Sequence, residues 1–240
     1  MTNASIPPIK AIAFDAYATL FDVYCMEALA EEYFPGQGKA LIVLWRQKQI
    51  DYTRIRSMSG QFRTFWDITR DALVFAARSL QLDLTDYRRQ HLMNQYACLR
   101  PFPENVATLR ALKAQGLPLA ILSNGTQSML DIAVKYNDLH GLFDHILSAD
   151  RVQQFKTSPA VYQLAVDAFA LPAREILFVS ANAWDACAAT WFGFSTFWVN
   201  RQRQPDEVLD VAPGATGFLL SDVLPYLRGE TSGAPSDIQP

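Results

Sequence analysis

The chain has 240 residues, half of them hydrophobic, and a net charge of −3. That length can bury one large core, or a core with a smaller inserted domain, and the absence of a basic stretch argues against a nucleic-acid partner. No apolar run reaches the roughly 20 residues of a membrane span, and the N-terminus "MTNASIPPIK" lacks the regions of a secretory signal, so we expect neither membrane association nor secretion. The three cysteines (Cys25, Cys98 and Cys187) form no metal motif, and we expect buried or partly buried thiols in a reducing, cytoplasmic setting.

The first predicted element is a short buried strand over residues 9–14, directly before Asp15. The following stretch contains no convincing strand. Its apolar residues recur at helical spacing and mark three faces: Leu41, Leu44, Trp45 and Tyr52; Phe65, Ile68, Ala72, Phe75 and Ala76; Leu92, Tyr96 and Leu99. We therefore predict that residues 21–101 form a helical cap domain inserted after the first strand.

Strands and helices alternate in the remainder of the chain. Strands are predicted over residues 117–122, 145–149, 175–180 and 195–199. Helices are predicted from Pro103 onward and over about 127–137, 159–170 and 183–192. This alternation predicts an α/β core of residues 1–20 and 102–228, built on a doubly wound, mostly parallel, Rossmann-like sheet. The polar tail, residues 229–240, is expected to be disordered.

Polar side chains cluster at the ends of the predicted strands. Ligands of open α/β sheets bind beyond the carboxyl ends of the strands. The residues concerned are Asp15, Tyr17 and Thr19 after the first strand, Ser123 and Asn124 after the second, Lys156 before the fourth, and Ser180, Asn182 and Asp185 after it. Two carboxylates, an ammonium and several hydroxyl and amide groups are therefore expected at one edge of the sheet.

The phrases around these residues resemble one family. "FDAYATLFDV", "LWRQKQ", "AILSNG" and "FVSANAWD" are similar to the L-2-haloacid dehalogenase branch of the haloacid dehalogenase superfamily, over about residues 9–200. The resemblance implies hydrolysis of short-chain L-2-haloalkanoic acids to D-2-hydroxy acids through an aspartyl ester, with inversion at C2. Haloacetates such as fluoroacetate are further candidate substrates. One departure is Ala18, where the family usually has glycine.

The residue types explain why halide, rather than phosphate, is the expected leaving group. Superfamily phosphatases carry a second aspartate two residues after the nucleophile, as a general acid, and hold magnesium through a Gly-Asp pair after the fourth strand. This chain has Tyr17 in place of the acid, and Ser180 and Ala181 in place of the pair. A halide departs unprotonated and needs only positive or hydrogen-bonding groups around it, whereas phosphoryl transfer without metal loses its main charge stabilisation. We expect no metal and no cofactor.

The resemblance also implies roles for individual residues. Asp15 is the nucleophile, Lys156 and Ser180 hold it ionised and oriented, and Tyr162 supports the lysine. Thr19 and Ser123 bind the nucleophile or the substrate carboxylate, Asn182 and Asp185 position and polarise water, and Arg46 and Asn124 hold the halide. The pocket wall comprises Tyr17, Gln47, Ile50, Phe65 and Trp184. Relatives are commonly homodimers, and sequence does not decide whether the apolar face of the cap serves that purpose.

Ordinary structural roles remain as alternatives for several of these residues. Asp15 could cap a turn, Lys156 could lie on the surface, Ser123 and Thr19 could cap helices, and the aromatic residues could be simple core. Two other functions stay open at this stage. One is a phosphatase on the same fold, and the other is a catalytically silent binding protein.

Overall fold

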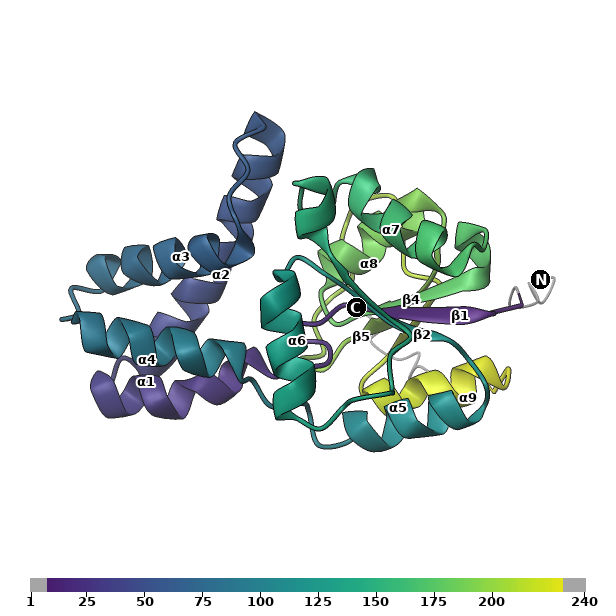
Figure 1. The fold of residues 1–240 in the computed structure, drawn as a ribbon, viewed down its shortest axis with the longest axis horizontal. Coiled ribbons are helices and arrows are strands. Elements are labelled where there is room, and N and C mark those ends of the chain that lie inside the picture. Colours follow the sequence, from purple (N-terminus) through teal and green to yellow (C-terminus); the bar gives the residue numbers. More distant parts are fainter. Residues whose placement is uncertain (1–7, 231–240) are drawn as a thin grey trace, which may run out of the picture.

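A six-stranded parallel sheet forms the centre of the molecule. The computed structural model describes residues 8–230 (Figure 1). The strands lie in the order β3-β2-β1-β4-β5-β6 and are all parallel. Their bounds are β1 (Ala11–Phe14), β2 (Leu119–Ser123), β3 (His145–Ser148), β4 (Ile176–Ser180), β5 (Ser195–Val199) and β6 (Ala215–Gly217). The predicted α/β fold with a doubly wound parallel sheet is confirmed.

The central strands are buried along their whole length, which is why they read as unbroken apolar runs in the sequence. Ala13 of β1 pairs with Ala120 of β2 on one side and with Phe178 of β4 on the other. The sequence did not predict β6, whose three residues carry no apolar run. Only its pairing with β5 makes it a strand.

Helices cover both faces of this sheet. Figure 1 shows α5 (Asn105–Ala114) and α9 (Val223–Leu227) on one face, and α7 (Pro159–Phe169) and α8 (Ala183–Phe192) on the other. A further helix, α6 (Gln127–Tyr136), follows β2. Its first turn is capped by Thr126, whose hydroxyl accepts the N–H of Met129 at 3.2 Å.

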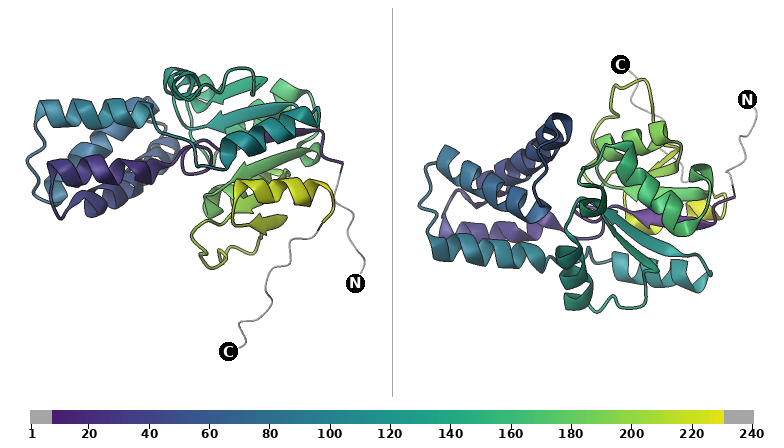
Figure 2. Two further views of the ribbon diagram at one scale, coloured as in Figure 1. Left: turned by 90° about the horizontal axis from the view of Figure 1, so that it is seen from below. Right: turned by 45° about the horizontal axis from the view of Figure 1, so that its top comes forward.

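Four helices between β1 and α5 form a separate group at the carboxyl ends of the strands (Figures 1 and 2). They are α1 (Glu27–Tyr33), α2 (Gly38–Ser59), α3 (Phe65–Ser79) and α4 (Asp86–Ala97). Thr64 and Thr85 cap α3 and α4, and α2 ends at Gly60 in the left-handed region, with φ 67°. The two chain segments that connect this group to the sheet run side by side, because Asp22 donates its N–H to the carbonyl of Arg100.

Most apolar positions predicted for these helices are buried. They are Leu41, Trp45, Phe65, Ile68, Ala72, Ala76, Leu92, Tyr96 and Leu99, whereas Leu44 and Tyr52 are half-buried. Phe75 is the exception, because it is 39% exposed. It lies at the rim of the group, with its ring edge-on to Tyr52 and under the ammonium of Lys48. Placing Phe75 on the buried face was therefore wrong.

The cysteine prediction is correct for two of three residues. Cys187 is buried and Cys98 is half-buried, but Cys25 is exposed in the short helix that follows the first connecting segment. Within residues 8–230, no helix is both long and apolar enough to span a membrane. Most of the predicted disordered tail, residues 231–240, lies outside the described part of the chain, as do residues 1–7.

Candidate active site

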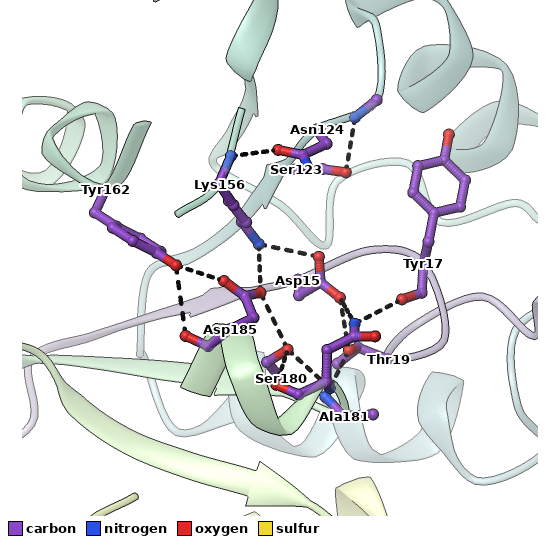
Figure 3. A network of polar contacts seen from close by, with 12 residues as sticks. Asp15, Tyr17, Thr19, Ser123, Asn124, Lys156, Tyr162, Ser180, Ala181 and Asp185 are labelled. Carbon is purple, nitrogen blue, oxygen red and sulfur yellow. Dashed lines mark hydrogen bonds and ion pairs between the residues drawn. The ribbon is translucent and has the colours of Figure 1, made fainter. Parts of the chain in front are cut away.

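The ends of three neighbouring strands bring the predicted polar residues together (Figure 3). Asp15 directly follows β1, Ser123 is the last residue of β2, and Ser180 is the last residue of β4. These strands are neighbours in the sheet and parallel, so their carboxyl ends meet at one edge. The predicted residues, although far apart in the chain, therefore lie close together at this edge.

Both carboxylate oxygens of Asp15 are held by donors. Oδ1 accepts a hydrogen bond from Lys156 Nζ at 3.0 Å. Oδ2 accepts from Thr19 Oγ1 and from Asn182 Nδ2, each at 2.9 Å. The Asp15 side chain is 8% exposed. Three donors from three segments therefore fix a nearly buried carboxylate in one orientation.

Lys156 lies between two carboxylates. Its Nζ is 3.0 Å from Asp15 Oδ1 and 2.9 Å from Asp185 Oδ2, and the side chain is 1% exposed. Burial by itself lowers the pKa of Lys156, but the charges of Asp15 and Asp185 outweigh it, so the pKa is raised above its ordinary value. The backbone N–H of Lys156 donates to Asn124 Oδ1 at 2.8 Å, which places the lysine relative to β2. The lysine is therefore a fixed partner of Asp15 that stays charged at neutral pH.

Asp185 is fully buried behind the lysine. Its Oδ2 accepts from Lys156 and from Ser180 Oγ at 3.1 Å, and its Oδ1 accepts from Tyr162 Oη at 2.7 Å. Burial raises the pKa of Asp185, while the lysine and the tyrosine hydroxyl act in the opposite direction. Asp185 thus contacts Asp15 through the shared ammonium.

These residues do not fit a magnesium ion. Magnesium requires oxygen ligands in a near-octahedral shell, but here an ammonium occupies the position between the two carboxylates. Ala181 supplies only its backbone N–H, which donates to Thr19 Oγ1 at 2.8 Å. In the described range 8–230, no group of three His, Cys, Asp or Glu side chains could hold a metal ion.

A small cavity lies between this network and the helical group. It offers about 20 Å³ to the centre of a water molecule, which is room for little more than one water. Its lining comprises Asp15, Tyr17, Arg46, Ile50, Thr53, Phe65, Ser123, Asn124, Asn182 and Trp184. Most of the predicted pocket and halide residues therefore surround one small space next to Asp15.

Tyr17 is a wall of this cavity. Its ring stacks on Phe65 and Tyr96, with 5.4 Å between centroids in both cases. Burial and the neighbouring Tyr96 raise the pKa of Tyr17 well above its ordinary value, so the phenol stays neutral. Figure 3 shows the ring directed away from the carboxylate network. Gly125 makes this placement possible, because a Cβ there would lie 2.9 Å from the Tyr17 ring.

Helix α2 presents one face to the cavity, and Gln47 is not on it. Arg46, Ile50 and Thr53 are spaced by four and three residues and line the cavity together. Gln47 is exposed and does not line it, so its predicted place in the pocket wall is corrected. Each residue of an α-helix is rotated by about 100° from the one before, which turns Gln47 away from the face of Arg46.

Sequence reasoning missed several residues that support the site. Thr53 could have been found from its helical spacing to Arg46. Buried Gln49 accepts from Arg46 Nη1 at 2.7 Å and donates to Thr69 Oγ1 at 2.6 Å, which orients the guanidinium. Both Gln47 and Gln49 stand in the family phrase "LWRQKQ", but helical spacing separates them, because Gln49 lies three residues after Arg46 and Gln47 only one.

A second group holds the loop after Asp15, residues 16–20, from the side away from the cavity. Asn105 Nδ2 donates to the carbonyls of Thr19 and Leu20 at 3.0 and 2.9 Å. Arg201 Nη2 donates to the Thr19 carbonyl at 3.3 Å and to Asn105 Oδ1 at 3.1 Å, and Nη1 pairs with Glu104. Residue separations of 86 and 182 in the chain give no sequence signal for these contacts. They hold the backbone of the threonine that donates to Asp15.

The loop itself contains a left-handed residue. Ala18 has φ 69°, a conformation that L-residues other than glycine rarely adopt. This is the position at which the resembling family usually has glycine. The added methyl group therefore costs conformational energy in this loop.

Comparison with known proteins identifies the class. Residues 9–193 match the haloacid dehalogenase-like hydrolases, and the chain belongs to this family. It is 47% identical over 205 residues to (S)-2-haloacid dehalogenase of Pseudomonas sp. strain YL, an alignment covering 85% of this chain and 88% of that protein. The resemblance inferred from the motifs is confirmed: within the family, the chain groups with the L-2-haloacid dehalogenases.

Solved structures agree. The crystal structure of an L-2-haloacid dehalogenase superimposes with a TM-score of 0.91 at 56% identity, covering 92% of this chain and 99% of that one. The L-2-haloacid dehalogenase of Xanthobacter autotrophicus, solved with chloropropionic acid covalently bound, has a TM-score of 0.87 at 32% identity, covering 93% and 100%.

Proposed function

We propose that this protein is a hydrolase of carbon–halogen bonds that converts short-chain L-2-haloalkanoic acids to D-2-hydroxy acids, with haloacetates as further candidate substrates. The observation that carries the proposal is Asp15, an oriented carboxylate that lines a small cavity together with Arg46 and Asn124. Relatives that carry the name (S)-2-haloacid dehalogenase support it.

In the first step, a carboxylate oxygen of Asp15 attacks C2 of the substrate in line with the carbon–halogen bond. The new C–O bond forms as the carbon–halogen bond breaks, and the halide leaves with the bonding electron pair. Arg46 and Asn124 donate hydrogen bonds to the halide, and Ser123 donates to the substrate carboxylate. Ser123 Oγ accepts the N–H of Gly125 at 3.1 Å, which leaves its hydroxyl proton to donate. The product is an ester of Asp15 with inverted configuration at C2.

In the second step, water adds to the Asp15 carbonyl carbon. Asn182 positions the water, and Asp185, whose pKa is raised by burial, takes its proton. The bond between the carbonyl carbon and the Asp15 oxygen that attacked C2 then breaks, and this oxygen leaves with the proton as the hydroxyl group of the hydroxy acid. One oxygen from water remains on Asp15. Lys156 and Thr19 keep the restored carboxylate in position for the next cycle.

We also propose that residues 21–101 act as a cap that closes the cavity over bound substrate. Three contacts between the helical group and the α/β core support this role. Ser57 Oγ accepts the N–H of Phe155 at 2.9 Å, Phe62 stacks on Phe155, and Arg54 lies 4.9 Å over the Trp184 ring. Closure would exclude water from the displacement step.

The remaining proposals concern assembly and location. A homodimer formed through the cap is supported by exposed apolar side chains on α2 and α3, namely Val43, Ile55, Met58 and Phe75. Light scattering after size-exclusion chromatography measures the mass in solution. A cytoplasmic location is proposed from the widely spaced cysteines alone.

The test is halide release from the separate enantiomers of 2-chloropropionate, with EDTA present, by wild type and by Asp15→Asn. We expect release by wild type from the L-enantiomer alone, with D-lactate as product, and no release by Asp15→Asn. If neither enantiomer nor fluoroacetate released halide, the proposed substrate class would be refuted. Hydrolysis of p-nitrophenyl phosphate in the presence of magnesium, but not in its absence, would favour the phosphatase alternative.

A further inference from the structure

The substrate cavity has no space to store the water that ester hydrolysis consumes. It offers about 20 Å³ to the centre of a water molecule, and one such water already needs about 10–15 Å³. Its walls include Tyr17, Ile50, Phe65 and Trp184, which give a bound water few partners. A haloacid is several times larger than one water, so the cavity must widen to admit it, and the substrate then fills the space gained. The second step therefore depends on water from elsewhere.

A much larger pocket lies on the other side of the loop after Asp15. By the same measure it offers about 410 Å³. It is lined by Ala18 of the loop, by Ala183 at the start of α8, and by the segment after β5 that includes Asn200, Gln202 and Glu207. The exposed Gln202 amide and Glu207 carboxylate provide hydrogen-bond partners that ordered water requires, whereas the Asn200 amide is already bonded to the backbone of Gln204. This pocket is therefore suited to hold water.

Asn182 lines both spaces. Its Nδ2 donates to Asp15 Oδ2 at 2.9 Å and to the carbonyl of Tyr17 at 3.2 Å, so the amide lies against the nucleophile. Two adjacent residues of the loop after Asp15 lie on opposite sides of it. Tyr17 lines the substrate cavity, and Ala18 lines the larger pocket. Asn182 and this loop thus form the partition between a small space and a much larger one.

The charge of the larger pocket favours water over the reaction's anions. Asp206 and Glu207 contribute negative charge to its lining, while the guanidinium of Arg201 is already paired with Glu104. Halide, substrate and hydroxy-acid product are all anions, so they are disfavoured beside these carboxylates. A neutral molecule carries no such cost.

We propose that the pocket lined by Ala18, Ala183, Asn200 and Gln202 is a water reservoir, from which the hydrolytic water reaches the Asp15 ester past Asn182. This inference rests on the proposed function. It separates the two steps in space: the displacement proceeds in the small cavity, and hydrolysis draws its water through the partition. The route serves only the second step, so blocking it should leave the first intact.

The experiment fills the pocket and resolves the two steps. Ala183→Phe places a ring near the partition, and Gln202→Trp places one at the exposed rim, away from Asn182. Ala107→Phe, on the exposed surface of α5 and in none of these linings, is the matched control. Rapid-quench measurement of halide from L-2-chloropropionate gives the burst and the steady-state rate, and mass spectrometry of the quenched protein measures the ester.

We expect both pocket variants to keep a halide burst stoichiometric with active sites. Their steady-state turnover should be lost in large part, and the ester should accumulate on the Asp15 peptide, while Ala107→Phe behaves as wild type. Unchanged turnover in pocket variants with a wild-type thermal transition would overturn the proposal, since water would then arrive by another route. An equal fall in burst and turnover would also overturn it, because the pocket would then serve only to hold the loop. Failure of the proposed function itself is distinct, because wild type would then release no halide at all, either before or during steady-state turnover.

Discussion

Replacing Lys156 with methionine removes the cation that Asp15 and Asp185 share inside the protein. The lysine and Asp185 side chains are 1% and 0% exposed, so water cannot replace the lost charge. Breaking a buried pair by removing one partner costs about 3–5 kcal/mol, because it leaves an uncompensated buried charge. For a chain of this length, that corresponds to a fall in melting temperature of roughly 6–20 °C.

The effect of Lys156→Met depends on pH in a direction that the geometry determines. The folded-state pKa of Lys156 is raised above 10.5. Its contribution to stability is therefore fully present below pH 10.5 and is lost as the pH rises through the raised value. The difference between wild type and variant should be constant from pH 7 to about 10 and shrink above that. It should also shrink in acid, where a proton bound by one of the two carboxylates replaces the missing cation.

Urea denaturation at pH 5, 7, 9 and 11 measures this dependence, and Asp15→Asn supplies the control. In the double variant the cation and one carboxylate are both absent, so the added loss from Lys156→Met should be smaller than in the wild-type background. A Lys156→Met variant within about 1 kcal/mol of wild type at pH 7 would refute the reasoning, since that is the range of an exposed pair. So would additive effects of the two substitutions.

Three further predictions concern residues around the site. Gln49→Ala should destabilise the protein by about 1–3 kcal/mol, because it leaves the buried hydroxyls of Thr69 and Tyr96 without this partner, and it should raise KM, because Arg46 loses the group that orients it. Gln47→Ala on the exposed face should change stability by less than about 0.5 kcal/mol. Urea denaturation and steady-state kinetics compare the two variants. Ala18→Gly should stabilise by up to about 1 kcal/mol without loss of activity, since glycine relieves the left-handed strain but gains freedom in the unfolded chain; a lower melting temperature would contradict this. Arg201→Lys should lower kcat with little change in KM, because lysine lacks the fork that holds the Thr19 loop, and a change confined to KM would argue against a positioning role.

Residues near one another in the chain were within reach of sequence reasoning. Buried parallel strands appear as apolar runs, and the polar residues that follow them must meet at one edge, which placed Asp15, Ser123 and Ser180 together. The motif phrases added the branch of the family and the departures at Tyr17 and Ala18. Five of the six strands were predicted, because only β6 depends on its neighbour rather than on its own residues.

Other features depend on contacts that no local pattern records. Phe75 is 39% exposed although it shares an apolar helix face with buried Phe65 and Ile68, which depends on the neighbours that the fold places around it. Arg201 reaches the loop after Asp15 across 182 residues, and Asn182 borders two spaces that exist only in the folded chain. The sequence by itself determined the chemistry, because reactive groups are properties of residue types and of the strand ends that carry them. Only the tertiary structure decided which side chains face the cavity and which face solvent, because that depends on how separately formed helices and strands pack against one another.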